Sequence, residues 1–394
     1  MSDVGQLHAL VARPGVSAAF AALGEGQARL VGGAVRDGLL GSAVADVDVA
    51  TLLSPYEVMR RCGAAGIKTV PTGIAHGTVT AVSAGETLEI TTLRADLATD
   101  GRHATVGFTD DWREDAARRD FTINALYFDL ATGEVHDYFG GLADLEAHRV
   151  RFIGEPLQRI AEDHLRILRF FRFTARFGSQ VDEAGLAACA ARANDLMALS
   201  RERIADEWLK LLALPQPAGT VALMLELGLL APVLPEIARK AWERLEALVD
   251  AEQKAGLAPD PLRRFAALLP PDPSVAEKVA ARLKLSNKAR RRLASATVAY
   301  GGEQPHALAY RGGVAEAQDR LLLGGEVEAA AALEGWSPPR LPIGGGQLIA
   351  RGLTPGPTVA RTLKAIEDRW VAEGFPDADR LDQLVTQALD RSKG

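Results

Sequence analysis

The stretch that decides the fold is RLVGGAVRDGLLG at residues 29–41, followed by DVDVAT at residues 46–51. It begins with a β-prone run, continues through a tight turn at Gly32 and Gly33, and enters a short helix that carries Arg36 in its first turn. Because glycines lack side chains, backbone amides at the turn can approach an anion, and the Arg36 guanidinium adds a forked donor. The turn has neither the glycine spacing of dinucleotide-binding proteins nor the Gly-Lys-Ser/Thr of a P-loop. It therefore predicts a triphosphate site, with a plain glycine turn as the alternative on these residues alone.

Acidic residues dominate the second part of the stretch. Side chains alternate along a strand, so Asp46 and Asp48 project from one face while Val47 points into the core. Two carboxylates this close repel each other unless a cation lies between them, and oxygen ligands beside a polyphosphate favour Mg²⁺. We therefore predict that Asp46 and Asp48 are catalytic and bind Mg²⁺, the alternative being a solvated loop with helix-capping aspartates. Glu89 lies in an apolar β-prone run, where it is either a third catalytic carboxylate or an exposed strand residue.

Length and composition set the broad class. The chain has 394 residues, of which 47% are hydrophobic and 24% charged, as expected for a globular protein of two or three domains. Its net charge of −6 does not by itself point to nucleic acid. Cys62 and Cys189 are too far apart in sequence for metal-ligand spacing or a disulfide framework. No run approaches the ~20 apolar residues of a membrane helix. We expect a cytoplasmic protein with no membrane partner.

The chain divides by pattern into a sheet-containing part and a helical part. The β-prone runs are residues 29–31, 47–51, 77–82, 88–92 and 124–129. Beyond residue 157 strand signals fade and apolar residues recur at helical spacing. The predicted fold class is an α/β head with a small mixed sheet, followed by an all-α neck, body and tail. We place these domains at residues 1–140, 141–198, 199–270 and 271–394.

One segment between the β-prone runs has little apolar periodicity. Residues 94–113 are rich in Asp, Arg, Gly and Thr, which predicts a mobile loop able to close over a ligand. Arg94, Arg102 and His103 are candidates for phosphate contacts there. A plain exposed connection is the alternative.

Three motifs, in order, resemble one family. The Gly-Gly-x-x-Arg-Asp turn with Asp-x-Asp is similar to the polymerase-β-type nucleotidyltransferases. The runs RRDFTINA at residues 118–125 and EDHLRILRF at residues 162–170 narrow the resemblance to the class II tRNA nucleotidyltransferase (CCA-adding) and bacterial poly(A) polymerase family. The resemblance extends from about Arg29 to Pro235, and it implies a polymerase-β-type catalytic head.

The resemblance also implies roles for individual residues. It implies metal binding for Asp46 and Asp48, and triphosphate contacts for Gly33 and Arg36. It implies nucleotide binding for Arg119 and a place near the ribose for Asp120. The neck residues that it implies in reading the incoming base are Asp163, Arg166, Arg169 and Arg172.

Physical reasoning supports base reading by the neck independently. Asp163 and Arg166 are three residues apart on a predicted helix, so they share a face and present an acceptor beside a forked donor. Cytosine and adenine offer an exocyclic amine to a carboxylate, whereas uracil O4 and guanine O6 are acceptors and are repelled. Such a pair selects C and A without a template. The alternative for the arginines is a solvated basic helix face.

A local basic stripe lies in the predicted tail. Residues 278–292 contain a run of Lys and Arg and no acidic residue, which suits an RNA backbone because cations that neutralise phosphates release counterions. A solvated helix face is the alternative. The residues that we predict to bind RNA are Lys284, Lys288, Arg290 and Arg291.

Together with the resemblance, these residues predict a template-independent enzyme. It adds C, C and A to the 3′ end of tRNA from CTP and ATP and releases pyrophosphate by a two-Mg²⁺ displacement. Poly(A) addition and CC-only or A-only tRNA extension remain alternatives. A nonenzymatic RNA-binding protein is a further alternative, which Asp46, Asp48 and Arg36 argue against because only catalysis needs that set.

Overall fold

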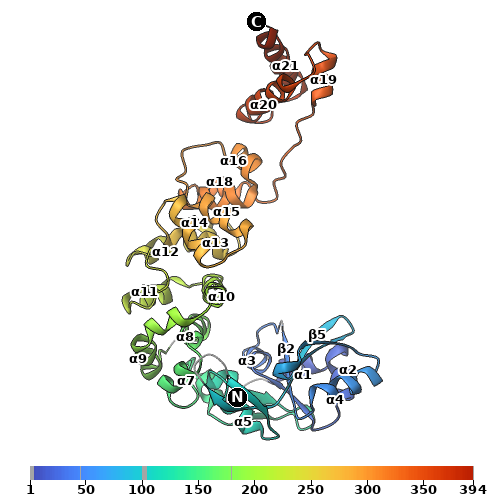
Figure 1. Ribbon diagram of the computed structural model, residues 1–394, viewed down its shortest axis with the longest axis vertical. Coiled ribbons are helices and arrows are strands. Elements are labelled where there is room, and N and C mark those ends of the chain that lie inside the picture. The colour runs from blue at the N-terminus through green and yellow to red at the C-terminus, as the bar shows by residue number, and fades with distance from the viewer. Residues whose placement is uncertain (1–3, 45, 100–103, 179, 394) are drawn as a thin grey trace. The chain divides into compact units, whose positions relative to one another are not determined.

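The structure is a computed structural model that describes residues 4–44, 46–99, 104–178 and 180–393 (Figure 1). Its internal contacts divide the chain into two compact units. The first consists of Met1–Trp208 and Leu223–Val233, and the second of Leu209–Ala222 and Leu234–Gly394. The finer predicted division into head, neck, body and tail stays a prediction. No helix among the described residues is long and apolar enough to cross a membrane.

A mixed sheet of 7 strands organises the first unit, in the order β3-β4-β5-β2-β1-β8-β9. Its strands are β1 Ala28–Val31, β2 Val47–Thr51, β3 Lys68–Gly73, β4 Thr78–Ser83, β5 Glu86–Thr92, β8 Leu126–Phe128 and β9 Val135–Asp137. Only the pair formed by β2 and β5 is parallel, and all other neighbours in this sheet are antiparallel. All five predicted β-prone runs contain strands, and the predicted mixed sheet is confirmed.

The sheet buries one set of alternating side chains against helices. Leu30, Val49 and Ile90 on neighbouring strands are almost fully buried, as the period of two along each strand requires. Helices α2 and α4 pack on β4 and β5, and α3 packs on β1, β2 and β8. The helices of this region are α1 Gly5–Val11, α2 Pro14–Leu23, α3 Gly33–Leu39 and α4 Pro55–Ala64. This arrangement leaves the alternate side chains of β2 and β5 free to line a site.

The prediction of a loop over residues 94–113 is wrong for most of its length. The segment forms a separate antiparallel hairpin, β6 Arg94–Thr99 with β7 Ala104–Phe108, followed by the start of α5 Trp112–Ala117. Its register shifts once between Asp96 and Ala98. The two strands form a sheet of their own and do not pair with the main sheet. Arg102 and His103 lie outside the described residues.

Among the described residues, those after the sheet form helices joined by turns and loops, with two isolated β-bridges and no further strand, as predicted. In the first unit α6 Gly141–Glu146 is followed by α7 Pro156–Glu162, α8 Leu165–Phe177 and α9 Glu183–Ala191. Helices α10 Arg201–Leu212 and α11 Ala218–Glu226 contribute residues to both units. The second unit adds α12 Ala241–Lys254, α13 Pro261–Leu268, α14 Pro273–Arg282, α15 Asn287–Ala296, α16 Pro305–Gly312, α17 Val314–Leu323, α18 Val327–Ala331, α19 Gly345–Ala350, α20 Pro357–Ala372 and α21 Ala378–Lys393.

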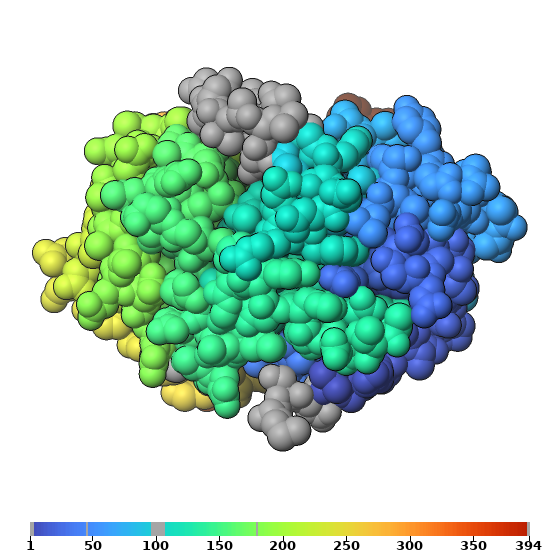
Figure 2. Space-filling view, turned by 90° about the horizontal axis from the view of Figure 1, so that it is seen from below, coloured from blue at the N-terminus to red at the C-terminus, as the bar shows by residue number. Residues whose placement is uncertain are grey.

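Helix α8 packs on the sheet-containing part through a cluster of aromatic rings. Phe121, between α5 and β8, lies with its ring centroid 5.0 Å from that of Phe152 and 5.4 Å from that of Phe173 on α8. Phe170 stacks on Phe152 at 5.4 Å. Figure 2 shows the result on the surface, where the blue and teal residues of the sheet-containing part run without a break into the green residues that follow. Phe170 and Phe173 of α8 are therefore core residues.

Candidate active site

The glycine turn lies between the end of β1 and the start of α3. Gly32 has a φ of 65°, a left-handed conformation that glycine adopts without steric cost, and its amide donates to the carbonyl of Leu126 on β8. The chain therefore turns sharply at Gly32 and begins α3 at Gly33. Both glycines line a cavity of about 630 Å³ on the first unit.

The predicted head and neck residues all line this one cavity. They are Gly33, Arg36, Asp46, Asp48, Glu89, Arg119, Asp120, Asp163, Arg166, Arg169 and Arg172. The structure thus brings together residues separated by more than a hundred positions in the sequence. The sequence analysis did not single out Thr78, Thr91, Asn124 and Phe173, which line the cavity as well.

The carboxylates form one part of the cavity wall. Asp48 on β2 pairs in register with Glu89 on the parallel strand β5, and Asp46 directly precedes β2. Burial, together with repulsion from Glu89 and Asp46, raises the pKa of Asp48 to about 6. Among the described residues, no group of three or more His, Cys, Asp or Glu side chains is arranged to hold a metal ion.

Arg36 lines the same cavity and is held there by a set of local contacts. Its side chain is buried, its Nε donates to Asp37 at 2.9 Å and its Nη1 donates to Asn124. Its guanidinium lies 4.5 Å from the ring centroid of Phe177 on α8. Burial lowers the pKa of Arg36 from its ordinary value. Asn124 is the residue that sequence reasoning missed here, although it lies inside the run RRDFTINA.

Asp120 and Arg169 connect the sheet-containing part to α8. Arg169 donates to Asp120 at 2.6 and 2.7 Å, while Asp120 also accepts from Asn124 at 3.0 Å and from the amide of Phe121 at 2.8 Å. Although burial alone would raise the pKa of Asp120, these contacts outweigh it and lower the pKa. Both side chains face the cavity while already partnered.

The predicted helix placement of Asp163 is wrong. Asp163 has an extended conformation (φ −151°, ψ 106°) and separates α7 from α8, so it does not share a helix face with Arg166. Its Oδ1 accepts from the amide of Leu165 at 3.1 Å, the bond typical of a residue that caps a helix start. Its Oδ2 accepts from Arg203 on α10 at 2.8 Å. Asp163 nevertheless lines the same cavity as Arg166.

The neck arginines do not form a solvated face. Arg166 donates from Nη1 to Glu162 at 2.6 Å and to the carbonyl of Arg159 at 2.7 Å. Arg172 donates from Nε to Glu207 on α10 at 2.6 Å. The alternative of a solvated basic helix face is therefore wrong, because each arginine has a protein partner.

In the second unit, some residues of the basic stripe are paired with carboxylates, and others are exposed. Arg282 binds both carboxylate oxygens of Glu236 at 2.7 Å, and Arg290 lies 3.8 Å from the carboxylate of Glu277. Lys288 and Arg291 are exposed, as is Lys284, which has a polar contact of its own. RNA binding by Lys284, Lys288, Arg290 and Arg291 stays a prediction.

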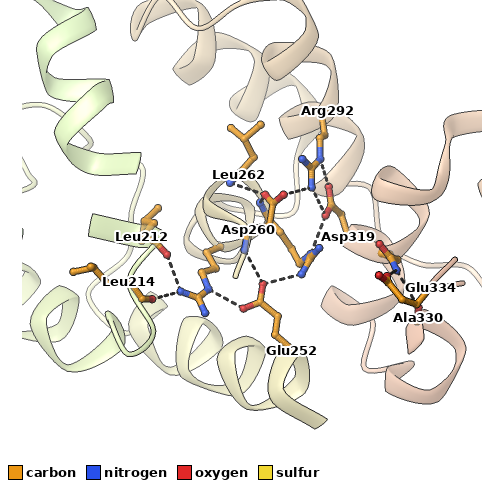
Figure 3. A network of polar contacts seen from close by, with 12 residues as sticks. Leu212, Leu214, Glu252, Asp260, Leu262, Arg292, Asp319, Ala330 and Glu334 are labelled. Atoms are coloured by element: carbon orange, nitrogen blue, oxygen red, sulfur yellow. Dashed lines mark hydrogen bonds and ion pairs between the residues drawn. The ribbon is translucent and has the colours of Figure 1, made fainter. Parts of the chain in front are cut away.

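The last arginine of the stripe belongs to a buried charge network (Figure 3). Arg292 donates to Asp319 at 2.7 Å, and Asp319 also accepts from Arg263 at 2.9 Å. Arg263 in turn donates to Glu252 at 2.8 Å, which accepts from Arg264 at the same distance. Glu252 and Asp319 are almost fully buried. Arg292 is therefore a structural residue and is not available to RNA.

Family models match two parts of the chain. Residues 28–151 match the model described as "Poly A polymerase head domain". Residues 179–240 match the one described as "Probable RNA and SrmB- binding site of polymerase A". The first match covers the sheet and its cavity-lining residues.

Similar proteins extend over nearly the whole chain. The CCA tRNA nucleotidyltransferase 1, mitochondrial, of Mus musculus is 36% identical over 370 residues, covering 88% of this chain and 83% of that protein. The CCA-adding enzyme of Lacticaseibacillus paracasei is 34% identical over 384 residues and 93% of each chain. The structure of the Bacillus stearothermophilus CCA-adding enzyme in complex with CTP matches with a TM-score of 0.72 at 29% identity, covering 93% of this chain and 94% of that one.

Proposed function

This chain belongs to the class II tRNA nucleotidyltransferase and bacterial poly(A) polymerase family, and on that premise we propose that it completes the 3′ ends of tRNA. It adds C, C and A from CTP and ATP. The observation that carries the proposal is the single cavity in which the carboxylates of β2 and β5 meet the arginines of the glycine turn and of α8. A nonenzymatic RNA-binding protein would have no use for paired, mutually repelling carboxylates in such a place.

The reaction forms one bond and breaks one. The 3′-hydroxyl oxygen of the RNA bonds to the α-phosphorus of the nucleotide, the bond from that phosphorus to the pyrophosphate oxygen breaks, and the hydroxyl loses its proton. Arg36, Arg119 and the backbone at Gly33 bind the triphosphate in this proposal. Because little covalent chemistry falls to the protein, its contribution is to position the reactants and to stabilise charge.

The acidic wall fits a divalent cation. Enzymes of this family generally use divalent metals, and Asp48 is a half-buried carboxylate whose pKa is raised first by burial and then by repulsion from Glu89 and Asp46. Mg²⁺ is commonly bound by one or two carboxylates plus substrate phosphates, and Asp46 and Asp48 line the same cavity as the glycine turn proposed to bind the triphosphate. We propose that Asp46 and Asp48 hold Mg²⁺, which when bound lowers the pKa of the attacking hydroxyl and stabilises the leaving pyrophosphate. Glu89 is proposed as the third acidic residue of this wall.

Base selection is proposed for Asp163 and Arg166 in a revised geometry. The two residues approach the cavity from the α7–α8 junction and from the first turn of α8, not from one helix face. Asp163 already accepts one bond on each oxygen, and each carboxylate oxygen has a second lone pair for an exocyclic amine. Arg169 and Arg172 hold the surrounding wall through Asp120 and Glu207.

One assay tests the function. The protein is incubated with tRNA that ends before CCA, tRNA that ends in CC, and an unrelated RNA, each with one labelled nucleotide, and the products are sequenced. We expect two C residues and then one A on the first substrate, one A on the second, and no extension of the third. Long A tracts on the unrelated RNA would indicate poly(A) addition, and extension by only C or only A would indicate a partial enzyme.

The cytoplasm is the proposed location, on the basis of the two widely spaced cysteines. Three similar proteins are named mitochondrial. Fractionation of the source cells followed by immunodetection decides between the compartments.

A further inference from the structure

A buried carboxylate that sequence reasoning did not single out lies behind the cavity. Asp115 on α5 is 1% exposed and is absent from the cavity lining. It accepts from Tyr127 Oη at 2.7 Å, from Arg118 Nε at 3.0 Å and from Arg119 Nη2 at 3.2 Å. It also accepts from the amide of Arg94, where β6 begins, at 3.0 Å. One carboxylate thus bonds to both arginines that enter the cavity from the end of α5.

The donors of Arg119 are divided between the protein and the cavity. Its Nε donates to Tyr127 Oη at 3.2 Å and its Nη2 donates to Asp115. Its guanidinium carbon lies 5.4 Å from the Tyr127 ring centroid. Its Nη1 lies 3.2 Å from the point where a Cβ on Gly32 would be, which places this nitrogen directly against the glycine turn. The Nε and Nη2 atoms of Arg119 are thus bonded to the protein, whereas Nη1 lies at the glycine turn, where we propose that the triphosphate binds.

The direction of each hydrogen bond in this group is fixed. Arg119 can only donate, so Tyr127 Oη accepts from Arg119 and gives its own proton to Asp115. Asp115 must therefore be ionised to accept from Tyr127 and the arginines together. Burial alone would raise the pKa of Asp115, but the charges of Arg119 and Arg118 and the bond from Tyr127 outweigh burial and lower it to about 2. Asp115 and the two arginines are therefore charged at neutral pH. We refer to Asp115 and Tyr127, which bond to Arg119, as the clamp.

We propose that Asp115 and Tyr127 are positioning residues that hold Arg119 so that its Nη1 contacts the phosphates or ribose, the parts that CTP and ATP share. This inference rests on the proposed function. The inference predicts that loss of the clamp weakens the binding of CTP and of ATP by the same factor, because neither Asp115 nor Tyr127 touches the base. A residue that only maintained the fold would alter stability without this shared effect on nucleotides.

The chain offers a matched control in Asp144. Asp144 is likewise a fully buried carboxylate of the same unit, and it accepts from Thr122 at 2.6 Å, from Arg149 at 2.7 Å and from Arg151 at 2.9 Å. Neither of these arginines lines the cavity. Asp144→Asn therefore removes the same kind of charge from the same kind of site without affecting Arg119.

The experiment measures CTP and ATP binding by titration calorimetry, the KM for each nucleotide and for tRNA, and the melting temperature. For Asp115→Asn we expect the Kd and KM of both nucleotides to rise together by about tenfold, as for the loss of one hydrogen bond to a charged group. The KM for tRNA should stay within about twofold. Asp144→Asn should lower the melting temperature to a similar extent with nucleotide constants within about twofold of the wild type.

Tyr127→Phe provides an independent test, because it removes one bond of the clamp and leaves the Asp115 bond to the amide of Arg94 in place. We expect a smaller increase in the Kd and KM of the nucleotides, about threefold, which is again equal for CTP and ATP. If Asp115→Asn does not fold, this variant decides alone. The inference is overturned if the nucleotide Kd and KM change alike in Asp115→Asn and Asp144→Asn, or if they change for only one of the two nucleotides. It is also overturned if they stay unchanged in Tyr127→Phe. A wild type that binds nucleotides but extends no tRNA would contradict the proposed function while leaving this binding test valid.

Discussion

Asp48 and Glu89 lie directly opposite each other on the parallel strands β2 and β5. Their neighbours Val49 and Ile90 form the next pair in register and are buried in the core. The alternation that buries the apolar pair therefore aims the acidic pair into the cavity. Both carboxylates owe their place to the register of the only parallel strand pair in this sheet.

Replacing Asp48 tests the proposed metal site. We expect Asp48→Ala to abolish nucleotide transfer while CTP binding weakens much less, because Arg36, Arg119 and the backbone at Gly33 still hold the triphosphate. Single-turnover rates and calorimetric Kd values for CTP measure the two effects separately. A variant that keeps more than about a tenth of the wild-type rate would contradict the assignment, since a bound metal ion contributes several kcal/mol to such a transition state.

The raised pKa of Asp48 predicts a pH-dependent cost in the metal-free protein. Its pKa is about 6 in the folded state and near 4 in an unfolded chain. The folded protein therefore binds the extra proton between these values, and stability falls as the pH rises from about 4 to about 7. In EDTA, Asp48→Asn should raise the free energy of unfolding by at most about 3 kcal/mol at pH 8 and have little effect at pH 4.5. Urea titrations at both pH values measure the change in the free energy of unfolding. An equal change at pH 8 and at pH 4.5 would contradict the prediction.

The buried network of the second unit should determine that unit's stability. Asp319 accepts from Arg263 and Arg292 and is fully buried. We expect Asp319→Ala to lower the free energy of unfolding by about 3–5 kcal/mol, because two arginines lose a buried partner. Urea titration measures the loss. Lys364→Gln is the control, since Lys364 is 63% exposed beside its acidic partners, and its replacement should leave stability nearly unchanged.

The exposed part of the basic stripe should bind RNA phosphates. Reversing Lys284, Lys288 and Arg291 to Glu should weaken tRNA binding and reduce its salt dependence by about one unit of log–log slope per lost contact. Arg282→Gln is the matched control, because its guanidinium is already bound by Glu236. Filter-binding titrations across a salt series give both slopes. An unchanged slope in the triple variant would mean that these residues form only a solvated face.

The sequence predicted the main elements of the site because they depend on local patterns. Alternation along residues 46–51 predicted that Asp46 and Asp48 share a face, and the two glycines predicted the turn, whereas for Glu89 the sequence left an exposed strand residue as the alternative. The parallel pairing of these strands had no local signal, because it depends on which of several β-prone runs lie side by side.

The errors have similarly specific causes. Asp163 lies in a helical-looking run, but an aspartate is also a common residue just before a helix, and here that preference ends α7 and starts α8. The partners Glu207 of Arg172 and Asp120 of Arg169 are 35 and 49 residues away in sequence. No periodicity relates such distant residues, so the arginines looked unpaired.

Asp163 has an ion pair that must be considered in any test of base selection. Arg203 donates to Asp163 Oδ2 at 2.8 Å while Oδ1 caps the start of α8. Removing the carboxylate therefore removes a cap as well as an acceptor, at a cost of about 1 kcal/mol in stability. Asp163→Asn is the informative partner variant, because its amide oxygen still caps the helix while its NH₂ group can donate.

Base choice should change in a defined direction when Asp163 changes. If Asp163 accepts from the exocyclic amine of cytosine and adenine, uracil presents O4 to a carboxylate, and an unpaired acceptor costs roughly 1–3 kcal/mol. Asp163→Ala should reduce CTP and ATP incorporation and shrink the discrimination against UTP and GTP, whereas Asp163→Asn should favour UTP through its new donor. Single-nucleotide incorporation on one truncated tRNA measures all four nucleotides. Arg203→Gln controls for the ion pair and should leave the order of preference unchanged. If Asp163→Ala keeps the full preference for CTP and ATP over UTP, selection lies with other residues of the cavity.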